Sequence, residues 1–317
     1  MAFPLPLSRS DYGCLFRLCG SVVSPLAGRY VYGAIVNNQF LNQTIKFIEE
    51  SDLVFIAPSI RPITFSENGN HTLHVSATCR MFESKLNGNP MLSQMIIFTL
   101  LDALLDYLYA ESEGLSFKRR YLALPDATSK DVVVKEVYRI FKLVRNSMVH
   151  SRDSFDISGS TVNISYTHCN TKFELICNLS SLQLMNSIVL ALSKNIGVCD
   201  KYFEIYLLSY YREMLDGISQ FSDDINKPLN SVSPSLDFKH RLRYRVPVNS
   251  NSSEDNGGYE LPNFSLHESE VWAGIDYIIN SNDCRYIVPS EALSNHLTIS
   301  PQELCVWKVS EANTFAM

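Results

Sequence analysis

The segment from residue 89 to about residue 217 constrains the fold most, because its apolar residues recur with the period of an α-helix. The pattern is clearest from about 130 to 149, where apolar side chains follow one another at spacings of three and four. Such spacing places them along one side of a helix, which buries that side in a core. Thr128 or Ser129 can cap the start of this helix. The apolar residues of the stripe are Val133, Val137, Ile140, Val144 and Met148.

Three more helices are predicted in the same segment from capping residues and apolar spacing. Asn89 followed by Pro90 is typical of a helix start, since asparagine can cap the first turn and proline suits the first helical position. Glycines end the two later helices, because glycine readily adopts the left-handed conformation found there. The expected helices run from Asn89 to about 111, from Ser180 or Ser181 to Gly197, and from about 199 to Gly217.

Alternating apolar and polar residues predict strands around these helices. Residues 154–177 alternate in this way, so we expect a β-hairpin between the second and third helices. Nearer the N-terminus, the β-like runs 29–36 and 53–58 flank a helical run, 38–51. The stretch "ENGN", residues 67–70, lies between two alternating runs and is typical of a hairpin turn. The N-terminal region therefore reads as a small α/β unit.

The C-terminal part contains two segments rich in Ser, Asn, Asp and Pro. Residues 221–236 are typical of a linker and residues 248–263 of a mobile loop. Short helices are predicted to begin at Ser265 and at Ser300, because a glutamate follows each serine by three positions, as in a capping box.

These patterns predict an α+β fold with three regions. Its centre is a helical bundle, residues 89–220, with the β-hairpin inserted at 154–177. A small N-terminal α/β unit, residues 1–88, and a small C-terminal region with flexible linkers, residues 221–317, flank the bundle.

Composition excludes several classes of protein. Apolar and charged fractions of 46% and 19% are those of a soluble globular protein. The longest apolar run, residues 95–110, is shorter than the roughly 20 residues that span a bilayer, so we expect a core helix and no membrane partner. The N-terminus lacks the basic and apolar pattern of a signal peptide, which predicts a cytoplasmic location. The eight cysteines contain no Cys-x-x-Cys pair, so neither a metal site nor a disulfide framework is expected, and no cofactor.

Net charge limits the ways in which the protein can bind nucleic acid. A net charge of −6 and a pI near 5.7 oppose a broad phosphate-binding surface. This net charge and pI remain compatible with an enzyme that contacts only one or two phosphates.

The second helix ends in "FKLVRNSMVHSRDSF", residues 141–155, which combines groups suited to a phosphodiester. Arg145 offers a permanent charge and a planar fork that can hold two phosphate oxygens. His150 can exchange a proton near neutral pH, and Asn146 can orient a ring nitrogen or a phosphate oxygen. In RNA the 2'-hydroxyl is a nucleophile already held beside the phosphorus, so an arginine and a histidine suffice without a metal.

The stretch "RNSMVH" resembles the signature of the HEPN superfamily, an arginine followed within a few residues by a histidine in a compact helical bundle. The resemblance covers about 89–217 and implies a metal-independent endoribonuclease that leaves a cyclic phosphate. It implies catalytic roles for Arg145 and His150, a supporting role for Asn146, and pairing of two chains around one cleft. The position two residues after the histidine is Arg152, where some relatives carry a tyrosine, so a toxin controlled by modification of that tyrosine is not implied.

Other interpretations of this helix end stay open. On an ideal helix five residues turn through roughly 500°, which leaves Arg145 and His150 about 140° apart. They converge if the helix breaks near Asn146 or if a twofold partner supplies half of the site. Alternatively, Arg145 and His150 only complement the negative end of the helix dipole, and Ser151 starts the turn that follows.

Two aspartates of the first helix are further candidates for the site. Asp102 and Asp106 lie four apart, on one side of that helix, where either could orient His150. They could equally be the solvated face of an apolar helix. Ser151 is a third candidate supporting residue.

The basic stretch "FKHRLRYR", residues 238–245, is the candidate RNA-binding element. Read as a strand, it places its cations on one face, where they could guide an RNA backbone. A solvated edge strand protected by charge explains the pattern as well. The four cations are Lys239, Arg241, Arg243 and Arg245.

With this resemblance we expect an endoribonuclease that acts on RNA. The resemblance also implies a homodimer, and a role in prokaryotic antiviral defence or as a toxin. The alternative is a non-catalytic module of the same fold that dimerises or binds a partner, with a regulatory protein as one candidate partner.

Overall fold

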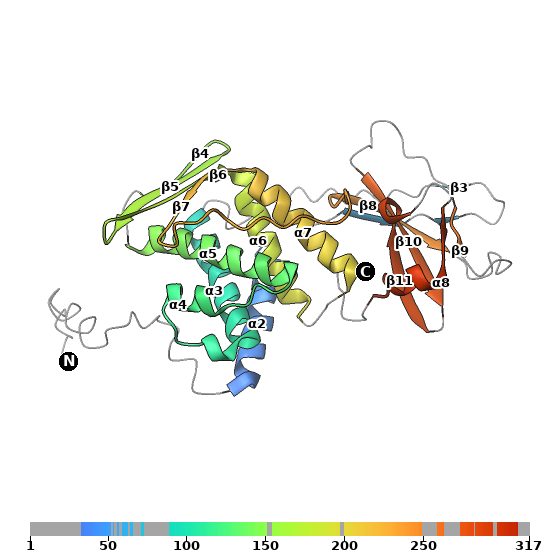
Figure 1. Cartoon of the computed structure of the whole chain (residues 1–317), viewed down its shortest axis with the longest axis horizontal. Coiled ribbons are helices and arrows are strands. Elements are labelled where there is room, and N and C mark those ends of the chain that lie inside the picture. Colours follow the sequence, from blue (N-terminus) through green and yellow to red (C-terminus); the bar gives the residue numbers. More distant parts are fainter. Residues whose placement is uncertain are drawn as a thin grey trace, which may run out of the picture.

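The computed structural model has a mixed α+β fold, as predicted, with helices at one end and a sheet at the other (Figure 1). It describes residues 33–51, 53, 56, 59–62, 64–65, 71–72, 89–150, 154–196, 200–248, 259–262, 273–281, 283–293 and 297–309.

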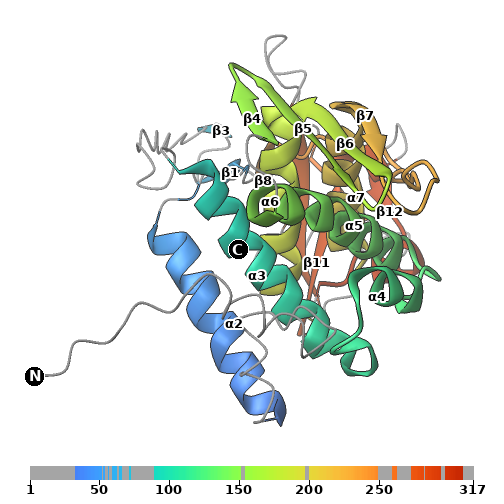
Figure 2. The same cartoon turned by 90° about the vertical axis from the view of Figure 1, so that its left-hand side faces the viewer.

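Long helices form the first part of the molecule. Four of them make a closed ring of contacts, in which α3 packs on α5, α5 on α7, α7 on α6, and α6 on α3. The fifth, α2, lies outside the ring against α3 and α6 (Figure 2). They are α2 (Gly33–Glu50), α3 (Pro90–Leu108), α5 (Ser129–His150), α6 (Leu179–Lys194) and α7 (Lys201–Asp216).

The apolar stripe predicted for α5 is buried in this ring. Val133, Val137 and Val144 are fully buried, and Met148 packs against the same core. The helix begins at the predicted cap, where the Thr128 hydroxyl accepts from the backbone amide of Asp131 at 3.1 Å. In α7, the Asp200 carboxylate caps the first turn by accepting from the Phe203 amide.

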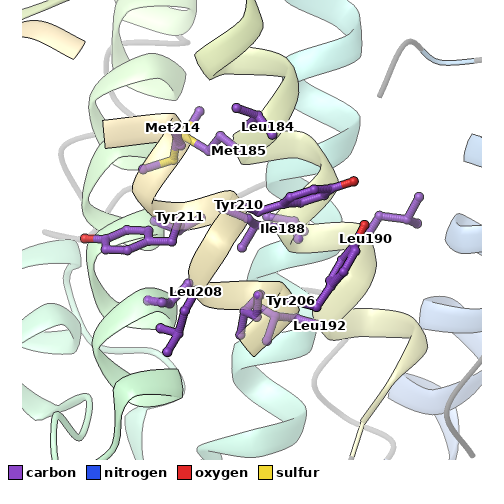
Figure 3. Close-up of a cluster of buried hydrophobic side chains, with 14 of the residues drawn as sticks. Leu184, Met185, Ile188, Leu190, Leu192, Tyr206, Leu208, Tyr210, Tyr211 and Met214 are labelled. Atoms are coloured by element: carbon purple, nitrogen blue, oxygen red, sulfur yellow. The ribbon is translucent and has the colours of Figure 1, made fainter. Parts of the chain in front are cut away.

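The core between α6 and α7 is mostly aliphatic and aromatic. Figure 3 shows Leu184, Met185 and Ile188 of α6 beside Tyr211 and Met214 of α7, all nearly inaccessible to solvent. Burial of this apolar surface is the main stabilising contribution to the bundle.

Helix α3 is long and apolar enough, by length and composition alone, to cross a membrane. Half of its most apolar window is buried inside the protein, and Leu100, Leu101, Leu104 and Leu105 have no exposed surface. The core helix of a soluble protein passes the same test of length and composition. The burial of α3 fits its interpretation as such a core helix.

An antiparallel sheet covers one side of the bundle and extends the predicted hairpin. Its strand order is β4-β5-β6-β7, and it packs on α5, α6 and α7. The prediction of a hairpin at 154–177 is confirmed only in part. The segment forms three strands instead of two, because the chain turns at Gly159, and a strand that follows α7 adds to its edge. The strands are β4 (Phe155–Ser158), β5 (Thr161–His168), β6 (Thr171–Asn178) and β7 (Ile218–Ser222).

A second sheet forms the other end of the molecule, with the order β1-β8-β10-β11 (Figure 1). Strand β8 is interior and runs parallel to both neighbours, β1 and β10. Two residues of α7, Tyr202 and Tyr206, pack against Phe238 just before β8 and so join the bundle to this sheet. The strands are β1 (Ser59–Pro62), β8 (Leu242–Val248), β10 (Ala273–Ser281) and β11 (Cys284–Pro289).

The region predicted as a separate N-terminal unit is divided between these two parts. Helix α2 joins the bundle and β1 joins the second sheet, so the described residues of 1–88 build no core of their own. Residues 33–36, predicted as β, are helical, while Leu53 and Ile56 lie in neither helix nor strand. The predicted hairpin around residues 67–70 is confirmed by pairing of β2 (Thr64–Phe65) with β3 (His71–Thr72).

The predicted linker at 221–236 is anchored rather than free. It begins inside β7, and Asp223 forms a bidentate ion pair with Arg139 of α5, with both contacts at 2.7 Å. Most of the predicted loop 248–263 and the helix expected at Ser265 lie outside the described residues.

Small elements complete the fold. The helix predicted at Ser300 is confirmed as α8, with the expected capping box between Ser300 and Glu303. No sequence pattern predicted α4, a short helix that packs on α5. The remaining elements are η2 (Ala110–Ser112), α4 (Phe117–Ala123), β9 (Tyr259–Glu260), η5 (Ser290–Ala292), β12 (Thr298–Ile299) and α8 (Pro301–Cys305).

Candidate functional site

Arg145 and Asn146 lie near the end of α5, where both side chains are half-buried. Nη1 of Arg145 donates to Oδ1 of Asn146 at 3.0 Å, and the guanidinium carbon lies 5.8 Å from the centre of the Phe117 ring of α4. Burial lowers the pKa of Arg145, and the negative charge of Asp102 on α3 opposes that change. The structure thus brings together three of the predicted residues, Arg145, Asn146 and Asp102.

The backbone of α5 remains helical through His150. The break near Asn146, which would let Arg145 and His150 converge within one chain, is therefore not there. Convergence of the two residues across two chains stays a prediction, and so does the alternative in which both only complement the helix dipole. Ser151 lies outside the described residues, and so does the side chain of His150.

An ion-pair cluster joins α3 to α4 beside Arg145. Arg120 of α4 donates to Asp102 at 2.8 Å and to Asp106 at 2.5 Å. Asp106 and Arg120 are each 4% exposed, so the alternative that the aspartates form a solvated helix face is wrong. Arg120 could not be predicted as their partner, because nothing in the sequence signalled α4.

One arginine here serves two buried carboxylates, which makes it unfavourable for both to be ionised. Burial is the largest cause that raises the pKa of Asp102 to about 6, and the charge of Asp106 adds to it. Arg120 and Arg145 pull the pKa back down. Asp102 can therefore gain or lose a proton near neutral pH, which is a property of acid and base groups at functional sites.

This shift predicts how stability depends on pH. Between the ordinary pKa of 3.8 and about 6, the folded protein binds more protons at Asp102 than the unfolded chain does. The free energy of unfolding contributed by this group therefore falls as pH rises through that window. We expect the wild type to lose on the order of 2 kcal/mol relative to Asp102→Asn between pH 4 and pH 6.5, measured by urea unfolding. A constant difference between the two proteins across this range would contradict the assignment.

Tyr166 of β5 lies beside Asn146 and was not predicted as a site residue. Its ring stacks on Phe173 of β6 with the ring centres 4.9 Å apart. Burial raises the pKa of Tyr166, while the amide of Asn146 and the charge of Arg145 lower it. Sequence alternation predicted the strand but could not show that it lies on α5.

No protein-family model matches the chain, and the comparisons with curated proteins and with solved structures find no similar protein. The resemblance to the HEPN motif rests on Arg145, Asn146 and His150 and on their position at the end of α5. Within the described part of the chain, no three His, Cys, Asp or Glu side chains are grouped as metal ligands would be.

The prediction that residues 238–245 bind RNA is wrong for the two arginines that lie in the second sheet. Arg243 and Arg245 are 1% and 5% exposed in the interior strand β8, so they cannot line an RNA path. Arg243 donates to Asp276 at 2.6 Å and also pairs with Glu291. The alternative of a solvated edge strand is wrong for the same reason.

The other two cations of the stretch lie before the strand. Lys239 pairs with Asp237 at 2.6 Å, and Arg241 pairs with Glu213 of α7. Both are at least partly exposed, and their charges are paired with these carboxylates beside α7.

Proposed function

We propose that the protein is a metal-independent endoribonuclease, with Arg145 and His150 as its catalytic residues. The strongest support is the environment of Arg145, a half-buried cation in contact with the Asn146 amide and close to an aspartate whose pKa is about 6. A fixed cation in a partly desolvated position stabilises charge on a phosphate more than it would in water.

The proposed reaction is an internal phosphoryl transfer. The 2'-oxygen attacks the phosphorus while the bond to the 5'-oxygen breaks, which leaves a 2',3'-cyclic phosphate and a 5'-hydroxyl. Arg145 would hold the phosphate oxygens as negative charge develops on them, and His150 would exchange a proton with the attacking or the leaving oxygen. Asn146 and Asp102 would position Arg145. A role in antiviral defence or as a toxin is implied by the resemblance alone.

The continuous helix favours a site shared between two chains. Because α5 does not break before His150, we propose that Arg145 of one chain acts with His150 of a second copy. Arg145→Ala and His150→Ala proteins should each cleave RNA at least about 10²-fold more slowly than the wild type. Mixed and allowed to exchange subunits, they should recover activity, since some dimers then contain one intact pair. A mixture no more active than its components would contradict the shared site.

Partner binding without catalysis is the second candidate function, and one feature favours it. An open groove of about 310 Å³ lies between α2 and α3, and Phe47 in its lining is 47% exposed. If the protein only binds a partner through this face, it should form stable complexes with a second protein. Neither the wild type nor the mixture of Arg145→Ala and His150→Ala proteins should then cleave RNA. The groove is lined by Phe40, Gln43, Thr44, Phe47, Met95, Ile96 and Thr99.

A further inference from the structure

A cluster of cations lies next to Arg145 and is bridged by one carboxylate. Lys142 of α5 donates to the carboxylate of Asp224 at 2.5 Å. Lys118 of α4 donates to the main-chain oxygen of Asp224 at 2.9 Å, and its Nζ lies 3.9 Å from the carboxylate. Two ammonium groups therefore face a single carboxylate, and the pair carries one positive charge more than its acidic partner.

Neighbouring positions on α5 and α4 and a ring contact on β6 connect this cluster to the candidate site. Lys142 and Arg145 are three residues apart on α5, so they are neighbours on its surface. Lys118 follows Phe117, whose ring is the one beside the Arg145 guanidinium. On the opposite side, Nζ of Lys142 lies 5.6 Å from the ring centre of Phe173, which stacks on Tyr166.

The residue before Asp224 fixes the backbone that carries it. Asp223 is 2% exposed, pairs with Arg139 through both carboxylate oxygens and accepts from the amide of Ile225 at 3.0 Å. Asp224 itself has 23% of its side chain exposed. Its carboxylate can thus rotate away from the lysines while the chain stays anchored at Asp223.

We propose that Lys118 and Lys142 form a phosphate-binding subsite for RNA beside Arg145, and that the Asp224 carboxylate occupies this subsite when RNA is absent. A carboxylate and a phosphate both present anionic oxygens to ammonium groups, so one can replace the other. A backbone phosphate adjacent to the scissile one would exchange with Asp224, which lowers RNA affinity in the resting protein. This subsite rests on the proposed ribonuclease function, because the ligand is taken to be RNA.

The test is binding of a single-stranded 2'-O-methyl RNA, which lacks the nucleophile and cannot be cleaved, followed by fluorescence anisotropy. Asp224→Asn should bind roughly two- to fivefold more tightly, the range expected for removal of one partly exposed charge pair. Lys118→Ala should bind more weakly by a similar factor, and the slope of log affinity against log salt should fall by about 0.7. The double variant should lose the gain of Asp224→Asn.

Matched controls separate the subsite from net charge. Asp283→Asn makes the same charge change in an exposed turn of the second sheet, at a positive φ of 57° that asparagine tolerates. Lys201→Ala removes a cation at the start of α7. Neither should change RNA affinity by more than the error of measurement.

Three results would overturn the subsite: equal tightening by Asp283→Asn and Asp224→Asn, unchanged affinity in Asp224→Asn and Lys118→Ala, or no binding by any protein. Since the probe cannot be cut, these results are independent of catalysis. If ordinary RNA is not cleaved but the expected affinities are found, the ribonuclease fails while the subsite stands as an RNA-binding site.

Discussion

His150→Ala is expected to cleave RNA roughly 10² to 10⁴ times more slowly than the wild type, the usual effect of losing a general acid or base. Without the imidazole, the proposed site loses the group that we assign to proton exchange with the ribose oxygens. Arg145→Lys keeps the charge but loses the planar fork, and should slow cleavage by about 10²-fold. Initial rates on a labelled single-stranded RNA measure both effects.

The control for His150→Ala is His168→Ala, which removes an exposed imidazole at the end of β5. This variant should keep the wild-type rate. Equal rates for wild type and His150→Ala would mean that the observed nuclease is a contaminant, and that the motif only ends the helix.

Arg243→Met is expected to destabilise the protein by about 3–5 kcal/mol, because it leaves buried carboxylates without their cation. Asp276 is fully buried beside Arg243, and Glu291 is mostly buried. The hydroxyl of Tyr202 on α7 donates to Asp276 at 2.6 Å, so the loss also weakens the contact between the bundle and the second sheet. Urea unfolding followed by circular dichroism measures the change.

Arg241→Met is the matched control, only two residues away. Its side chain is 44% exposed and pairs with Glu213, so its loss should cost about 0–1 kcal/mol. If both variants are equally stable, Arg243 is not the structural residue that its burial indicates. If the folded Arg243→Met protein binds RNA with the wild-type affinity, the role of Arg243 is structural, as we infer.

Periodic apolar spacing was enough to predict the helical segment. The stripe from Val133 to Met148 specified both the helix and its buried side, because a period near 3.6 residues fits no other regular element. Capping residues placed the starts of α3, α5 and α8 to within one residue. These signals are local, so a sequence read without relatives contains them.

Polar contacts between distant segments could not be predicted. Arg120 belongs to a helix of only seven residues, which is too short for a readable period, and its burial depends on Asp102 and Asp106 of α3. Arg243 resembled a surface cation because its partners, Asp276 and Glu291, are 33 and 48 residues away in the sequence. Charged residues are buried only when paired, and only the fold makes those pairs.

The strand order of the second sheet could not be predicted from the sequence either. Strand β1 pairs with β8 across most of the chain, in parallel, and no turn residues specify such a pairing. For the same reason, the N-terminal region looked like a unit with its own core.

The ends of the RNA fragments show whether the 2'-hydroxyl is the nucleophile. Purified wild-type protein would be incubated with RNA in EDTA, beside the same RNA carrying 2'-O-methyl groups throughout, and the ends mapped. We predict 2',3'-cyclic phosphate and 5'-hydroxyl ends from the unmodified RNA, no cutting of the methylated RNA, and loss of all cuts in His150→Ala. Ends with a 3'-hydroxyl and a 5'-phosphate, or no cleavage of unmodified RNA by the wild type, would contradict the account.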